Sequence, residues 1–149
     1  SRRFRIFFWL PAVLLTAGLV IKKRNEFLAF HPALAKSKKA PRLARRFLAD
    51  ARRALQQENA AQVYACLGKA ITDFIGHRWN VACGGMTGPE LKDTLGRFGI
   101  EAECVESVVQ TLSEFDGARF SGAGLTEEQM RADYAKTEQI LGALMKQKR

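Results

Sequence analysis

The stretch that organises this chain is RRFRIFFWLPAVLLTAGLVIKKR, residues 2–24. Its middle, Ile6–Ile21, holds sixteen residues without a charge, and a cluster of three cations flanks it on each side. At a rise of about 1.5 Å per residue, a helix of this length covers roughly 24 Å, slightly less than a hydrocarbon core of about 30 Å. We therefore predict one N-terminal transmembrane helix within residues 1–30. The residues expected to anchor it at the two interfaces are Trp9, Lys22, Lys23 and Arg24.

Two other interpretations of this stretch stay open. A secretory signal peptide also has a basic start and an apolar centre, and Ala33-Leu34-Ala35 resembles a cleavage site. The three cations directly after the apolar run argue against cleavage, because they are typical of a stop-transfer flank. The run can also be a buried core helix, although a helix that is apolar on every face is unusual in a chain of 149 residues.

Positive charge is concentrated in the first third of the chain. Residues 1–53 carry a net charge of +12, whereas residues 54–149 carry −3. The positive-inside rule places the part after Ile21 in the cytoplasm and predicts a single-pass protein of the bacterial inner membrane. Cations beside a membrane also attract anionic lipid, at about 1 kcal/mol for each nearby Lys or Arg. We expect residues 31–41 to form a polybasic linker.

Helical periodicity dominates residues 42–149, and no strand pattern appears. Pro41 suits the first turn of a helix, Asn59 suits an N-cap, and Thr87-Gly88-Pro89-Glu90 has the pattern of a capping box. Gly99 is a candidate left-handed stop, and Thr126 caps the last helix. The fold class predicted for this part is all-α, a cytoplasmic bundle of about five helices.

The sequence offers little material for catalysis. It has two histidines, and neither of its glycine-rich loops follows a strand or ends in Gly-Lys-Ser/Thr, so a phosphate-binding loop is unsupported. Three cysteines without a Cys-x-x-Cys pair agree with a reducing compartment. We expect no catalytic residue, no cofactor and no metal, although four side chains leave a zinc site as an open alternative: Cys66, His77, Cys83 and Cys104.

Arg119-Phe120 is the most informative pair outside the apolar run. We expect a helix to end at residues 116–120, and the pair has two interpretations there. Phe120 can be buried while Arg119 bonds to carbonyls or to Asp116, which would fasten the loop to the bundle. Alternatively, Arg119 and Phe120 are candidate partner-binding residues, since Arg and aromatic residues are enriched at protein interfaces. The residue types alone favour the fastening role.

These segments together resemble the C-terminal part of BatD proteins, the bacterial aerotolerance or oxygen tolerance family. After the apolar run and the basic connection, the resemblance rests on Ala51-Arg52-Arg53-Ala54-Leu55, Val63-Tyr64-Ala65-Cys66-Leu67, Ala70-Ile71, Met86-Thr87-Gly88-Pro89-Glu90-Leu91 and Ala118-Arg119-Phe120. It covers nearly the whole chain. It implies a large periplasmic region of β-sandwich character before this segment, and it carries over no catalytic residue.

The resemblance further implies work with membrane-anchored von Willebrand factor A domain proteins and a MoxR-type AAA+ ATPase, in envelope maintenance or stress tolerance. We therefore expect a non-enzymatic scaffold, a membrane-anchored docking module. The alternative is a membrane-tethered nucleic-acid-binding regulator that uses residues 36–53. Nucleic acid is the less favoured partner, because such a domain normally carries its cations on one face of its folded part.

Overall fold

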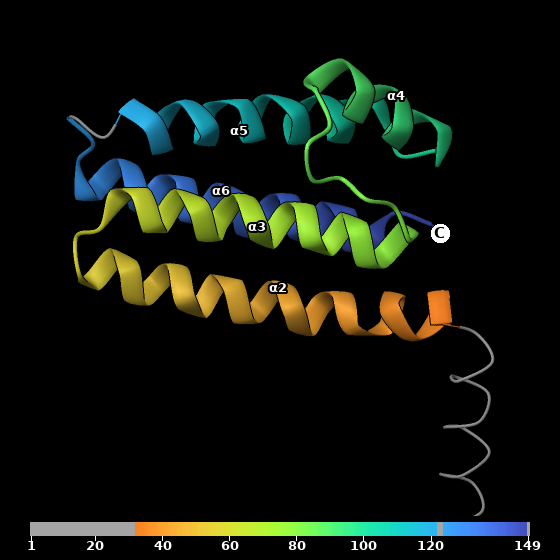
Figure 1. Cartoon of the computed structure of the whole chain (residues 1–149), viewed down its shortest axis with the longest axis horizontal. Coiled ribbons are helices and arrows are strands. Elements are labelled where there is room, and N and C mark those ends of the chain that lie inside the picture. The colour runs from red at the N-terminus through yellow and green to blue at the C-terminus, as the bar shows by residue number, and fades with distance from the viewer. Residues whose placement is uncertain (1–31, 122–123, 149) are drawn as a thin grey trace, which may run out of the picture. The chain divides into compact units, whose positions relative to one another are not determined.

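The computed structural model describes residues 32–121 and 124–148, all of it helix, turn or loop. Contacts divide the chain into two units, residues 1–35 and residues 36–149, and the second unit is the subject here. The helices are α2 (Pro32–Gln56), α3 (Ala60–Trp79), α4 (Gly88–Arg97), α5 (Ala102–Ser121) and α6 (Glu127–Lys146) (Figure 1). No strand occurs in the described ranges. The prediction of an all-helical bundle of about five helices is confirmed for this part of the chain.

The predicted membrane helix lies outside the described residues, as do Trp9, Lys22, Lys23 and Arg24. Among the helices that the structure does describe, none combines the length and the apolar character needed to cross a bilayer.

Helix α2 corrects two expectations. It begins at Pro32 rather than at Pro41, so residues 32–41, where we expected a polybasic linker, are helical. Pro41 lies inside the helix, where the missing N–H and the ring cost about 3 kcal/mol. Packing offsets that cost, because small side chains along one side of α2 are buried, and so let the helix approach its neighbours closely. They are Ser37, Ala40, Ala44, Ala51 and Ala54.

Helix α3 occupies the centre of the unit, with α2 on one side and α5 on the other (Figure 1). Asn59 caps its start by accepting a hydrogen bond of 3.2 Å from the amide of Gln62, as predicted. Asn80 ends it in the left-handed conformation, with φ 53°, and donates its N–H to the carbonyl of Gly76. Because α3 has neighbours on several sides, its buried stripe is wide.

Helices α4 and α6 both begin with a capping box. The Thr87 side chain accepts from the Glu90 amide, and the Glu90 carboxylate accepts from the Thr87 N–H at 2.8 Å. Thr126 and Gln129 repeat the arrangement at the start of α6. Gly99, with φ 72°, terminates α4 as predicted, since a residue with a Cβ rarely adopts that conformation.

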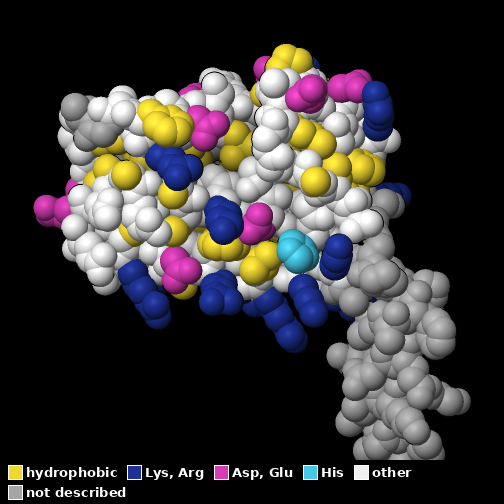
Figure 2. Space-filling view, in the orientation of Figure 1, with side chains coloured by type: hydrophobic (Ala, Val, Ile, Leu, Met, Phe, Trp, Pro, Cys, Tyr) yellow, Lys and Arg dark blue, Asp and Glu magenta, His cyan; other side chains and the backbone are white. Residues whose placement is uncertain are grey.

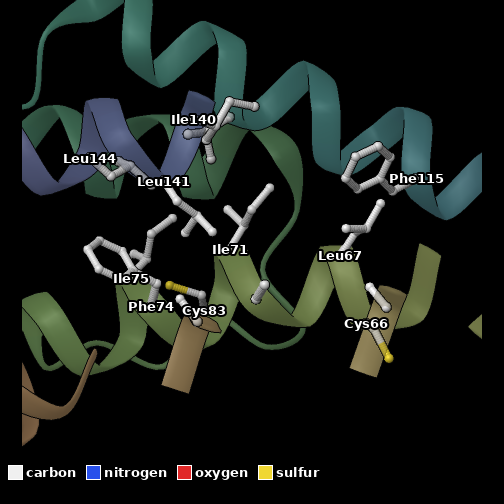
Figure 3. Packing of buried hydrophobic residues seen from close by; sticks show 14 of the residues in the cluster. Cys66, Leu67, Ile71, Phe74, Ile75, Cys83, Phe115, Ile140, Leu141 and Leu144 are labelled. Carbon is white, nitrogen blue, oxygen red and sulfur yellow. The ribbon is translucent and has the colours of Figure 1, made fainter. Parts of the chain in front are cut away.

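The core lies between α3, α5 and α6 (Figure 3). In this close view Leu67 and Ile71 of α3 point toward α5 and α6, while Phe115 of α5 faces Leu67. Helix α6 contributes Ile140, Leu141 and Leu144 to this core, and each of these side chains is at most 5 % exposed. Burial of these side chains from three helices supplies the main stabilisation, at about 1.5–3 kcal/mol for each large apolar residue.

Candidate docking surface

Helix α5 brings Arg119 and Phe120 to the surface. We expected the helix to end within residues 116–120, and it ends one residue later, at Ser121. Phe120 is 81 % exposed, and the Arg119 guanidinium lies over its ring at 5.7 Å from the ring centre. The fastening role, which required a buried Phe120, is therefore wrong. The pair is available at the surface instead.

A groove of about 850 Å³ runs from Arg119 along the face formed by α3 and α5. The loop between α3 and α4 crosses this face (Figure 1), and Figure 2 shows hydrophobic side chains recessed there between charged ones. Four of the groove-lining residues are apolar and half-buried: Phe47, Met86, Val109 and Leu112. They come from α2, the loop and α5. We call this groove, together with Arg119 and Phe120, the docking surface.

Charged groups of both signs lie at the edges of the groove. The ammonium of Lys69 on α3 sits over the ring of Phe47 on α2, at 5.2 Å from the ring centre. Asp50 and Asp116 also line the groove, as does Arg119. Apolar side chains therefore share this groove with polar and charged ones, and a mixture of both is usual at protein interfaces.

Two cysteines in the groove are poor nucleophiles. Burial raises the pKa of the Cys66 thiol, and the charge of Asp50 raises it further. Burial together with Asp73 raises the pKa of Cys83 to about 11. Both thiols are therefore protonated at neutral pH, and they react poorly because the thiolate is the reactive form.

The four side chains of the open zinc alternative do not form a metal site. Cys66, Cys83 and Cys104 are all free thiols, buried in the bundle. Nowhere in the described ranges do three or more His, Cys, Asp or Glu side chains come close enough to hold a metal ion.

A second charged feature lies on α2. Seven cations between Lys38 and Arg53 are exposed, and Figure 2 shows a row of Lys and Arg side chains along the edge formed by this helix. From the sequence we expected some of these cations to lie in a linker, whereas α2 places all seven on one surface.

Comparisons with known proteins leave the family open. No protein-family model matches the chain, and neither a search of curated proteins nor one of solved structures found a match.

Sequence reasoning singled out Arg119 and Phe120 but missed the groove beside them. In the sequence Met86 stands out only within the quoted segment Met86–Leu91, and Phe47 and Leu112 carry no sign of a shared surface. Their common surface carries no local signal, because it joins segments that lie up to 65 positions apart, between Phe47 and Leu112.

Proposed function

We propose that this chain is a non-enzymatic docking module of the bacterial inner membrane, anchored by residues 6–21, with its helical unit in the cytoplasm. The observation that carries the proposal is Phe120, an aromatic side chain 81 % exposed, whose ring lies against the guanidinium of the groove-lining Arg119. Exposing a large aromatic ring to water is unfavourable, and Arg and aromatic residues are enriched in interface cores. A partner that covers Phe120 would recover this free energy.

The resemblance to BatD proteins supports the choice of partner. It points to a von Willebrand factor A domain protein or to a MoxR-type AAA+ ATPase, in envelope maintenance or stress tolerance. The acidic balance of residues 54–149, a net −3, agrees with a protein partner more readily than with a nucleic acid.

The test is a binding measurement with the full chain in lipid nanodiscs. The two candidate partners from the same cell are titrated against wild type and against the double variant Arg119→Ala/Phe120→Ala. We expect the double variant to bind at least tenfold more weakly, since truncation of interface anchors costs 2 kcal/mol or more. Met145→Ala is the matched control, because Met145 is also a large exposed apolar residue, 39 % exposed, on α6. If wild type binds neither partner, or if both variants bind equally, the proposal fails.

The exposed cations of α2 favour a second candidate function, binding of nucleic acid by residues 36–53. Such binding would weaken steeply with salt, because each neutralised phosphate releases a counterion. Titration of the full chain with duplex DNA at low and high salt tests this candidate. No binding at low salt would eliminate it.

A further inference from the structure

Seven of the eight exposed cations of α2 lie on one side of the helix, and Lys36, whose ammonium donates to Asn80, is the exception. At 100° per residue the seven fall within an arc of about 140°. The small buried residues, such as Ala40 and Ala51, fall on the opposite side. We call this arc the basic stripe. Its members are Lys38, Lys39, Arg42, Arg45, Arg46, Arg52 and Arg53.

The basic stripe is long and almost free of compensating charge. From Lys38 to Arg53 it extends about 22 Å along the helix. Asp50 is the one acidic residue in the α2 sequence, and its carboxylate lies 3.8 Å from Arg53 at the edge of the stripe. Since that pair is exposed, it neutralises the stripe only in part. The other six cations face solvent without an acidic neighbour on their own helix.

DNA and a flat anionic surface both carry the negative charge that such a stripe attracts, and their shapes distinguish them. The major groove of DNA is about 12 Å wide, so a helix enters it only if it protrudes from its domain. The inner side of α2 is instead packed against the bundle from Ser37 to Leu55, so the groove walls would meet the bundle. A flat anionic surface has no walls, and it contacts the whole stripe at once.

The sequence before α2 supports a flat partner. The apolar run at residues 6–21 and the cations that follow it lie within eleven positions of Pro32, where α2 begins. We therefore propose that the basic stripe binds the anionic headgroups of a lipid bilayer, with α2 parallel to the bilayer surface. The stripe includes neither Arg119 nor Phe120, although Asp50, which lies 3.8 Å from Arg53, also lines the groove of the docking surface.

The first experiment places a reporter in the stripe of the full chain. Ala49 is exposed and lies near the middle of the arc, so Ala49→Cys accepts an environment-sensitive fluorophore without removing a cation. Ala102→Cys is the matched control, because Ala102 is an exposed alanine on α5, and α3 separates α5 from α2 (Figure 1). The unlabelled wild type, treated in the same way, measures any reaction of the buried native cysteines.

The labelled chains are reconstituted into vesicles of phosphatidylcholine with or without phosphatidylglycerol. We expect the Ala49 reporter to be quenched by headgroup-attached quenchers only when phosphatidylglycerol is present, and less so at high salt, because salt screens the attraction. The Ala102 reporter is expected to remain in water under all conditions. This readout does not depend on whether residues 6–21 span the bilayer, since both vesicle types contain the same chain.

The second experiment removes charge while keeping the fold. Lys38→Gln, Arg42→Gln, Arg45→Gln and Arg46→Gln are combined, because Gln keeps a helix propensity close to that of Lys and Arg. Each cation near an anionic surface contributes roughly fivefold, so four losses are expected to weaken the contact by two to three orders of magnitude. The control removes the same charge elsewhere, through Lys92→Gln, Arg97→Gln, Arg131→Gln and Lys146→Gln. Circular dichroism verifies that both variants stay helical.

Two results would overturn the inference. One is an Ala49 reporter that stays in water on phosphatidylglycerol vesicles. The other is an equal effect of the two charge variants, which would make net charge, rather than the stripe, the cause. If the Ala49 reporter responds to duplex DNA and not to anionic vesicles, nucleic acid is the partner and the lipid contact is refuted. Binding of a partner protein at the docking surface is measured separately, so either proposal can fail alone.

Discussion

The hydroxyl of Tyr64 on α3 donates a hydrogen bond of 2.6 Å to the carboxylate of Asp133 on α6. The ring of Tyr64 also packs against Phe115 of α5, with 5.4 Å between the ring centres. One side chain therefore joins three helices, through an apolar contact on one side and a charge-assisted hydrogen bond on the other.

Replacement of Tyr64 by Phe tests this bond. Tyr64→Phe keeps the ring but leaves the half-buried Asp133 carboxylate without its donor, and hydrogen bonds to charged groups contribute about 1.5–3 kcal/mol. We expect a loss of that size in the free energy of unfolding, measured by urea denaturation. Tyr134→Phe is the control, because it preserves the contact between the Tyr134 ring and Arg52. Equal stability of the two variants would contradict the role assigned to Tyr64.

Alkaline pH tests the same contact without a change in packing. Burial, followed by the hydrogen bond and the charge of Asp133, raises the pKa of Tyr64 above its ordinary value of 10.0. The stabilisation is therefore complete below pH 10.0 and is lost as pH rises toward the folded-state pKa. Between pH 10.0 and the folded-state pKa, wild type is therefore expected to lose stability faster than Tyr64→Phe. Cys83 titrates in both proteins, so the difference between the two curves isolates Tyr64.

Two glycines inside α3 should respond oppositely to alanine. A Cβ at Gly68 would have no heavy atom within 4 Å, whereas a Cβ at Gly76 would lie 3.0 Å from the Val81 carbonyl oxygen. Gly68→Ala is expected to stabilise the protein by about 0.5–1 kcal/mol, because alanine has less freedom to lose on folding. Gly76→Ala is expected to bring no such gain or to destabilise the protein, because the backbone at Val81 has to shift. Thermal unfolding of both variants checks this, and a stabilised Gly76→Ala would contradict the close approach.

Two buried threonines form another matched pair. Thr137 donates its hydroxyl to the Asp133 carbonyl at 2.9 Å, whereas the Thr111 hydroxyl, also buried, has no partner among the described residues. Thr137→Val is expected to cost about 1 kcal/mol, the usual contribution of one hydrogen bond. Thr111→Val is expected to be neutral or stabilising, because it replaces an unsatisfied hydroxyl by a methyl group of similar shape. A larger cost at Thr111 than at Thr137, by urea denaturation, would refute this assignment.

The native thiols should react slowly. Burial raises the pKa of all three cysteines, with Asp50, Asp73 and Glu101 as the secondary causes. A rise from 9.0 to about 11 leaves Cys83 with roughly a hundredfold less thiolate at neutral pH. We expect a maleimide to label the folded wild type far more slowly than Ala49→Cys, and mass spectrometry identifies the labelled site. Rapid labelling of a native cysteine in the folded chain would be contrary to its buried position.

Local signals in the sequence predicted the helix ends well. The capping box at Thr87, the N-caps at Asn59 and Thr126 and the stop at Gly99 are confirmed, because each depends on residues within about four positions. The helical periodicity of residues 42–149 also predicted the fold class, since apolar side chains there repeat at helical spacing.

Packing overrode local signals at two places. Pro41 is a strong start signal, yet α2 extends nine residues before it, because small side chains on both sides of Pro41 pack into the same interface. The end of α5 falls at Ser121, one residue beyond the expected range, and Phe120 in its last turn lies in solvent rather than in the core. A local pattern cannot anticipate either result. The burial of one side of α2 and the exposure of Phe120 both depend on how distant segments pack.

The sequence by itself determined that this unit is helical, where most of its helices begin and end, and that its cations gather before residue 54. Periodicity, caps and composition are properties of neighbouring residues, so the chain carries them before it folds. Only the tertiary structure decided that seven of those cations share one side of α2, that Arg119 lines a groove and that Phe120 is exposed. Those features depend on which sides of the helices the core occupies, and burial of apolar surface selects those sides for the whole unit at once.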